Sequence, residues 1–119
     1  MAKVLIHLAS GPEHPTRAAL ALLVAKTAVS EGHSVSVFLA GDAVQLARPE
    51  TAAAVQGVGT GSFAESWDAL AAADVPIYLS GISSKARGLG GDAVEGRAEL
   101  ALPQKLVGLA VWADTTITY

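Results

Sequence analysis

The sequence Val75-Pro-Ile-Tyr-Leu-Ser-Gly-Ile-Ser-Ser-Lys-Ala-Arg-Gly88 joins a short apolar run to a turn of small residues and then to a basic segment. The run at residues 76–79 is continuous rather than alternating, which is typical of a strand covered on both faces. One or two helical turns after the serine–glycine turn carry Lys85 and Arg87. We therefore expect a buried strand whose end presents hydroxyl groups and positive charges.

Two similar strands are expected nearer the start of the chain, at residues 3–8 and 33–39, where β-branched residues recur in short apolar runs. Between them, residues 16–31 predict a helix. A further helix, at about residues 103–114, precedes a last β-branched strand at 115–119. Strands that alternate with helices at this spacing predict an α/β fold of three layers, in which helices cover both faces of a parallel sheet.

The segments between these elements carry weaker signals. A short helix is expected after Gly41, ending at Pro49, whose ring interrupts helices, and residues 50–55 are expected to continue as another helical piece. Residues 62–65, Ser-Phe-Ala-Glu, have the spacing of a capping box, which would open a helix to about residue 73. Glycine-rich segments at 56–61 and 88–102 predict connectors, and the second is expected to be mobile or held only by a partner.

The composition predicts one domain over residues 1–119, with a core of aliphatic side chains. Hydrophobic residues make up 51% of the chain and aromatic residues only 5%. Charged residues make up 16%, which is low for a monomer that covers its own surface, so we expect a homo-oligomer. The helix at 16–31 favours this, because Leu20, Leu22 and Leu23 lie on different sides of it and a second subunit would cover one of them.

Charge and residue counts disfavour several classes of function. The net charge of −3 and the lack of a basic run argue against binding to nucleic acid or to a membrane surface. No apolar run reaches the roughly 18 residues of a membrane span and no secretion signal is recognisable, so we expect a cytoplasmic protein. Because the chain has no cysteine, thiolate catalysis, disulfides and cysteine-ligated metals are excluded.

Signals for cofactors and metals are weak. No Gly-x-Gly-x-x-Gly follows the first strand and no Walker A sequence occurs, which disfavours dinucleotides and nucleoside triphosphates. The histidines His7, His14 and His33 are dispersed without the spacing of a metal site. We therefore expect no cofactor and no structural metal.

Ligands of parallel sheets gather outside the carboxyl ends of the strands. This rule directs attention to loops at residues 9–16, 40–42 and 80–88, and the ligand-binding candidates in or beside them are Ser10, His14, Arg17, Asp42, Ser80, Ser83, Ser84, Lys85 and Arg87. Lys85, Arg87 and Arg17 could form an anion pocket with helix amides. The alternative is that these charges are solvated or form salt bridges.

The hydroxyl and imidazole groups have competing interpretations. We expect Ser80, Ser83 and Ser84 to cap the short helix rather than to act as nucleophiles, because no Gly-x-Ser-x-Gly elbow surrounds them. His14, between prolines in a loop, is a candidate general acid or base, whereas His7 within a strand is expected to be a packed or interface histidine rather than a ligand. Trp67 and Trp112 fall at core spacing on helices and are interpreted as packing residues.

Segments of this chain, in this order, resemble the DsrE/DsrF-like family, which includes sulfur-relay subunits of the TusD type. They are Ser-Gly-Pro-Glu and Pro-Thr-Arg within residues 10–17, Gly-His-Ser-Val-Ser-Val-Phe at 32–38 followed by Gly-Asp-Ala-Val, and Val-Pro-Ile-Tyr at 75–78 followed by Lys-Ala-Arg-Gly-Leu at 85–89. The resemblance covers nearly the whole chain. It implies a flavodoxin-like α/β/α fold with about five parallel strands, of which only four are evident, and cytoplasmic dimers, trimers or hexamers.

One departure from the family bears on mechanism. In the sulfur-relay members, a cysteine at the end of the third strand carries sulfur as a persulfide. The resemblance aligns that position with Ser80, and a second cysteine of some relatives with Ser83. Because a serine oxygen does not form the required sulfur–sulfur bond, cysteine-dependent sulfur transfer is excluded for this chain.

The leading hypothesis is a non-persulfide homologue of sulfur-relay subunits that forms a homo-oligomer and binds a small anion or a partner protein at the strand ends. One alternative is a small enzyme whose pocket uses His14, Ser80 and Arg17. Another is a structural subunit of a heteromeric sulfur-transfer complex. A hydrogen bond between His14 and Ser80 would favour the enzyme, and a polar pocket that joins Arg17 to Arg87 would favour binding.

Overall fold

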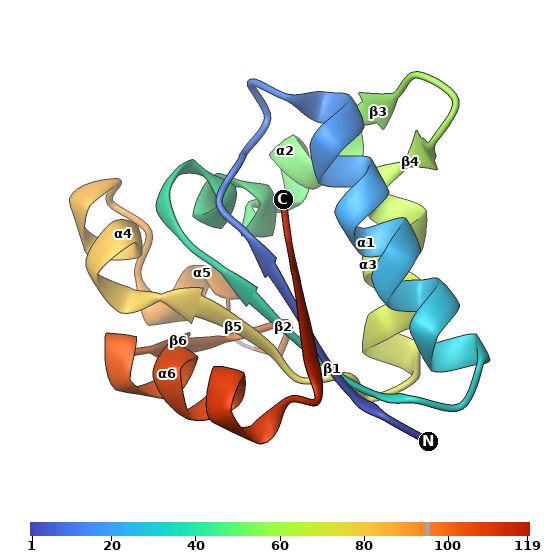
Figure 1. Cartoon of the computed structure of the whole chain (residues 1–119). Coiled ribbons are helices and arrows are strands. Elements are labelled where there is room, and N and C mark those ends of the chain that lie inside the picture. Colours follow the sequence, from blue (N-terminus) through green and yellow to red (C-terminus); the bar gives the residue numbers. More distant parts are fainter. Residues whose placement is uncertain (95) are drawn as a thin grey trace.

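A five-stranded parallel sheet forms the centre of the protein in the computed structural model, which describes residues 1–94 and 96–119 (Figure 1). The strand order is β6-β5-β2-β1-β7. The expected α/β fold with a parallel sheet of five strands is confirmed, and β6 is the strand that the sequence left unplaced. The bounds are β1 (Lys3–Leu8), β2 (Ser34–Leu39), β5 (Ile77–Ser80), β6 (Glu99–Ala101) and β7 (Thr115–Thr118).

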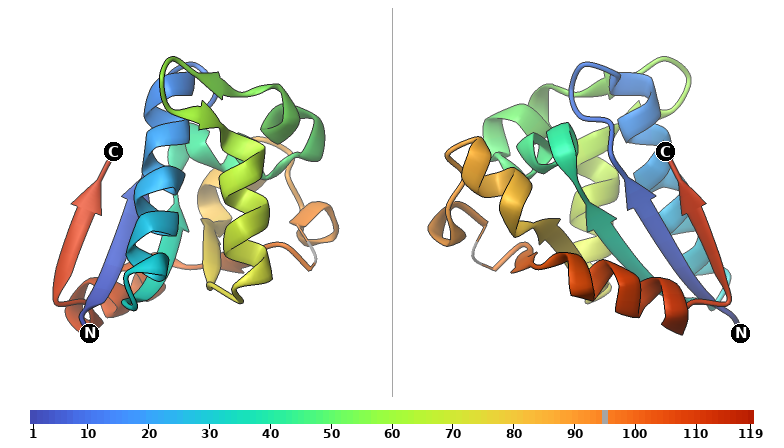
Figure 2. Two further views of the ribbon diagram at one scale, coloured as in Figure 1. Left: turned by 90° about the vertical axis from the view of Figure 1, so that its right-hand side faces the viewer. Right: turned by 60° about the vertical axis from the view of Figure 1, so that its left-hand side comes forward.

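Helices cover the two faces of the sheet unequally (Figure 2). The helices α1 (Pro15–Ser30) and α3 (Phe63–Ala72) pack against each other on one face, and α6 (Pro103–Trp112) packs on the opposite face. The short helical segments are the 3-10 helix η1 (Gly41–Ala47), α2 (Pro49–Ala54), α4 (Gly81–Ala86) and α5 (Gly91–Val94). None of the helices in the described ranges has the length and apolar character needed to cross a membrane.

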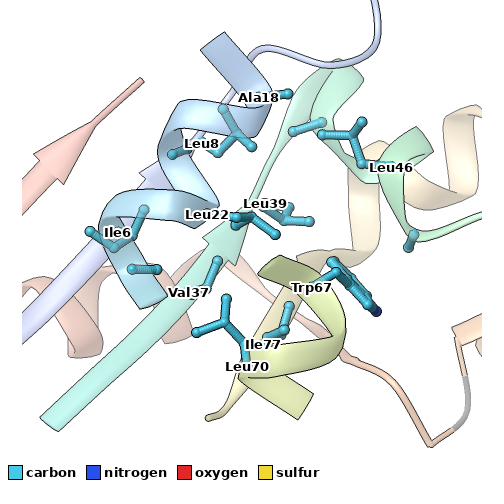
Figure 3. Close-up of a cluster of buried hydrophobic side chains, with 14 of the residues drawn as sticks. Ile6, Leu8, Ala18, Leu22, Val37, Leu39, Leu46, Trp67, Leu70 and Ile77 are labelled. Carbon is cyan, nitrogen blue, oxygen red and sulfur yellow. The ribbon is translucent and has the colours of Figure 1, made fainter. Parts of the chain in front are cut away.

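The larger hydrophobic core lies between the sheet and the layer of α1 and α3 (Figure 3). Alternate residues of the strands face it, such as Ile6 in β1 and Val37 and Leu39 in β2. Leu22 of α1 and Trp67 of α3 fill it from the helical side. Each such aliphatic side chain contributes about 1.5–3 kcal/mol relative to an exposed one, so this layer supplies most of the hydrophobic stabilisation.

The opposite face of the sheet has a smaller core beneath α6. Leu5 and Phe38 are buried there against Leu109, and Leu106 and Trp112 pack beside them. The positions of Trp67 in the larger core and Trp112 in this one agree with their interpretation as packing residues. The sheet is therefore covered on both faces, as its continuous apolar strands require.

The helical piece expected at residues 50–55 is α2, which begins at Pro49, a position where a ring without an N–H group is tolerated. Two connectors have more regular structure than the sequence indicates. The strands β3 (Gln56–Gly57) and β4 (Gly61–Ser62) form a small antiparallel hairpin in place of the expected connector. The segment 88–102 contains α5 and β6 instead of being irregular throughout, and residue 95 within it lies outside the described part of the chain.

The second side of α1 is covered by elements of the same chain. The helix packs against α3 and against β3. Leu22 is fully buried, and Leu20 and Leu23 are half-buried. The apolar circumference of α1 is thus explained within one chain, and it no longer argues for a second subunit.

Candidate functional site

The loops that follow β2 and β5 are joined by hydrogen bonds at the carboxyl edge of the sheet. Ser80 is the N-cap residue of α4, and its Oγ accepts a hydrogen bond from the Ser83 N–H at 3.2 Å. The Ser83 Oγ accepts a hydrogen bond from the Gly41 N–H at 2.9 Å, which ties α4 to the loop after β2. These serines therefore cap and connect backbone segments, which is the role that the sequence favoured for them.

An ion pair between Asp42 and Arg87 strengthens the same connection. The Arg87 Nη2 lies 2.9 Å from the Asp42 Oδ1, and its Nε lies 3.2 Å from the same atom. The Arg87 Nη1 also donates to the carbonyl oxygen of Ser83 at 3.0 Å. The positive charge of Arg87 is thus paired with a carboxylate, which corresponds to the salt-bridge alternative rather than to an anion pocket.

The two other candidates of α4, Ser84 and Lys85, have different environments. Ser84 is fully buried, and its Oγ has no hydrogen-bond partner within the described residues. Lys85, the next residue, is exposed. In the described residues, neither side chain forms a hydrogen bond or ion pair with Arg87 or Asp42, so the polar groups of α4 are not joined in one network.

Ser10, His14 and Arg17 form a separate group between β1 and α1. The Arg17 Nη1 donates to the Ser10 Oγ at 3.1 Å. Gly11 is buried where this loop crosses the loop after β2, because a Cβ atom at Gly11 would lie 2.3 Å from the Asp42 carbonyl oxygen. The group of Ser10, His14 and Arg17 therefore lies beside the loop that carries Asp42, but no ion pair joins Arg17 to Asp42.

A hollow of about 460 Å³ lies beside the β1–α1 loop. Its lining comprises Glu13, His14, Pro15, Thr16, Arg17, Leu20 and Tyr119. Tyr119 follows β7, and its backbone N–H donates to the His7 carbonyl at 2.8 Å, which continues the pairing of β7 with β1. The strands β2, β5 and β6 lie on one side of β1, and β7 lies on its other side. The hollow therefore lies at the point where the strand order reverses, between β1 and β7.

The electrostatics of this hollow differ from those of the Arg87 pair. Arg17 is exposed and, in the described part of the chain, has no carboxylate within ion-pairing distance. The carboxylate of Glu13 accepts a hydrogen bond from the backbone N–H of Gly11. A guanidinium without an acidic partner thus faces a concave surface at the reversal of strand order, which is where ligand crevices form in open parallel sheets.

The residues of the enzyme alternative are not brought together. Ser80 lies at the start of α4, whereas His14 and Arg17 line the hollow beside α1. Across residues 1–94 and 96–119, no hydrogen bond connects His14 to Ser80. The same ranges contain no group of three or more histidine, cysteine, aspartate or glutamate side chains that could hold a metal ion.

The surroundings of His7 alter its titration. It lies in β1 with its ring edge toward Phe38, at a centroid distance of 6.2 Å. Its Nε2 is buried and has no hydrogen-bond partner within the described residues. Burial lowers the pKa of His7 from its ordinary value of 6.5, because the protonated ring is poorly solvated there. This environment agrees with the sequence interpretation of His7 as a packed or interface histidine rather than a ligand.

The contribution of Tyr119 to the hollow is absent from the sequence predictions. The β-branched residues at the end of the chain predict a strand, and parallel strands place their carboxyl ends at one edge. The sequence does not predict that this strand, β7, pairs with β1 instead of β6. This pairing places Tyr119 beside His14 and Arg17.

The geometry defines the class of protein as a three-layer α/β protein with a five-stranded parallel sheet and a loop-lined carboxyl edge. The profile of the DsrE/DsrF-like family matches residues 2–119, and the chain belongs to this family. The family assignment made from the sequence is therefore confirmed.

Solved structures that share the fold include the following two. The ychN protein from E. coli is 21% identical and superposes with a TM-score of 0.83, with 100% of both chains covered. The protein of unknown function MTH1491 from Methanobacterium thermoautotrophicum is 15% identical, with a TM-score of 0.66 and 100% of both chains covered. At these identities the likeness shows the fold alone. No curated protein sequence matches the chain.

Proposed function

We propose that this protein is a non-persulfide homologue of sulfur-relay subunits that acts by reversible binding, as a cytoplasmic homo-oligomer. Membership of the DsrE/DsrF-like family and the shared fold support the first part. The chain has no cysteine, and serines occupy positions 80 and 83, where the family resemblance places sulfur-carrying groups. A protein of this kind can hold a ligand through charge and hydrogen bonds, but it does not carry sulfur on a thiol.

The ligand site in this proposal is the hollow lined by His14, Arg17 and Tyr119. The observation that carries the proposal is the position of Arg17, without a carboxylate partner among the described residues, at the reversal of strand order. Ser10 hydrogen-bonds to Arg17 and orients the guanidinium. His14 adds a second nitrogen donor on the same wall.

The ligand class is a small oxyanion such as sulfate, thiosulfate or phosphate. A planar guanidinium offers paired N–H donors to two oxygen atoms of one anion. Glu13 also lines the hollow, but its carboxylate is engaged by the Gly11 N–H, so the repulsion that it exerts on an anion is reduced. This assignment moves the anion site from the Arg87 loop to the Arg17 loop.

Isothermal titration calorimetry of the purified chain with sulfate, thiosulfate and phosphate tests this function. Arg17→Met should weaken binding of the preferred anion by about tenfold or more, because a charge-assisted hydrogen bond contributes roughly 1.5–3 kcal/mol. Lys26→Met is the matched control, since it removes one positive charge from the same helix nine residues further along, about 13 Å away. Equal losses in the two variants, or no binding by the wild type, would contradict the proposal.

A further inference from the structure

The hollow beside the β1–α1 loop is larger than an inorganic oxyanion needs. Its volume is about 460 Å³. An anion such as sulfate takes the space of only a few water molecules, each of roughly 30 Å³, so most of the hollow stays unfilled when such an anion pairs with Arg17. Sites for organic ligands span roughly 300–1,000 Å³, and the hollow falls within this range.

The part of the hollow beyond Arg17 has an apolar lining. Leu20 lies three residues after Arg17 in α1, which places the two side chains next to each other on one face of the helix. Leu20 is half-buried, so it leaves apolar surface open to the hollow. Tyr119, which follows β7, also lines the hollow and packs against the larger core. The hollow therefore has a charged end at Arg17 and an apolar end at Leu20 and Tyr119.

The charges of the lining suit a ligand with one negative charge. Arg17 is the one lining residue with a permanent positive charge, and His14 adds a nitrogen donor whose charge depends on pH. Glu13 lies on the same lining, and its carboxylate accepts the Gly11 N–H. Each further negative charge on a ligand would be repelled by Glu13 without a second cation to balance it. A monoanion is therefore favoured over a dianion.

Thr16 supplies a second donor for the anionic group. It lines the hollow next to Arg17 in α1. The Thr16 Oγ1 accepts a hydrogen bond from the backbone N–H of Val58 at 3.0 Å, which holds the hydroxyl group in place. A hydroxyl group donates one hydrogen bond while it accepts others, so Thr16 can donate to a ligand without losing its contact with Val58.

We propose that the hollow binds a small organic monoanion, which carries a carboxylate or sulfonate group on an apolar body. The inference rests on the proposed function and narrows its ligand class. The anionic group pairs with Arg17, and the apolar body lies against Leu20 and Tyr119. An exposed ion pair contributes little in water, whereas each buried CH₂ group tightens binding by about fourfold. The apolar body therefore decides the affinity.

Isothermal titration calorimetry of the purified chain with two pairs of anions provides the test. The pairs are methanesulfonate with benzenesulfonate, and acetate with benzoate, so the charged group is constant within a pair and only the apolar body differs. The aromatic member of at least one pair should bind about tenfold more tightly or better, and the pair that shows the larger gain identifies the charged group. Equal affinities within both pairs would overturn the inference.

A leucine variant locates the apolar end. Leu20→Ala should weaken binding of the aromatic anion by about threefold or more, with a smaller effect on its methyl counterpart. Leu23→Ala is the matched control, because Leu23 is half-buried in the same helix but does not line the hollow. It should retain the affinities of the wild type. The same loss in both leucine variants, or no loss in Leu20→Ala, would contradict the assignment of Leu20.

Failure of this inference is distinguishable from failure of the proposed function. Arg17→Met should weaken both members of a pair to the same extent, because the charged group is common to them. If sulfate binding depends on Arg17 but the aromatic anions bind no more tightly than their methyl counterparts, the inference fails and the proposed function stands. If the wild type binds none of the anions, both are contradicted.

Discussion

A single histidine sets part of the pH dependence of stability. The pKa of His7 is lowered in the folded chain, so below its ordinary value of 6.5 the unfolded chain binds more protons than the folded one. The free energy of unfolding should therefore decrease as the pH falls through 6.5 toward the folded pKa, and His7 should contribute no slope well above 6.5. One proton limits the slope to about 1.4 kcal/mol per pH unit, and partial burial makes it smaller.

Urea denaturation at several pH values measures this slope. His7→Gln should flatten the stability curve between about pH 7 and pH 5. His14→Gln, which makes the same substitution on an exposed loop, serves as the control. An unchanged slope in His7→Gln would contradict the assignment of the buried ring.

Gly11 determines how closely two loops approach each other at the carboxyl edge. An alanine Cβ would lie 2.3 Å from the Asp42 carbonyl oxygen, a backbone atom, so both loops would have to move. Gly11→Ala should destabilise the protein by about 1–3 kcal/mol, the usual cost of overpacking. Gly90→Ala, where a Cβ meets nothing within 4 Å, should be neutral or slightly stabilising. Thermal or urea unfolding of the two variants makes the comparison, and equal stabilities would contradict the close approach.

At the scale of single elements, α3 depends on its first residue. The Ser62 Oγ accepts a hydrogen bond from the Glu65 N–H at 3.3 Å, which satisfies one of the free N–H groups of the first turn. Ser62→Ala should cost about 0.5–1 kcal/mol, because the bond is long and exposed. Ser30→Ala is the control, because the exposed Ser30 Oγ donates to the Thr27 carbonyl at the end of α1 and caps no free N–H group, so the loss should stay within about 0.5 kcal/mol. A urea midpoint of Ser62→Ala equal to that of this control would contradict the capping role.

The elements that the sequence predicts well are those with long or strongly apolar patterns. The helix α1 begins and ends within a residue of the predicted bounds, since its apolar run is bordered by Pro15 and Gly32. The strand β6, with three residues in a glycine-rich segment, has too short a pattern to be recognised. Pairing with β5 stabilises it, and this tertiary contact leaves no periodic signal in the sequence.

At the scale of the whole molecule, the sequence predicts which residues are candidates for a site, but not which of them lie together. The rule that ligands gather at the carboxyl ends of strands directs attention to the loops that contain these candidate residues. It does not tell which loops share a hollow, because that depends on β7 pairing with β1. The sequence therefore leaves open whether Arg17 and Arg87 share an anion pocket or form salt bridges, whereas in the structure Arg87 pairs with Asp42 and Arg17 lines a separate hollow with Tyr119.

The central claim, anion binding at the reversal of strand order, is tested most directly by recording ¹H–¹⁵N correlation spectra of the wild-type chain during titration with sulfate, thiosulfate or phosphate. The account predicts saturable shifts confined to the amides around His14, Arg17 and Tyr119, with the Ser80–Ser83 turn unaffected. Shifts that centre on the turn at Ser80, or that spread evenly without saturation, would contradict it.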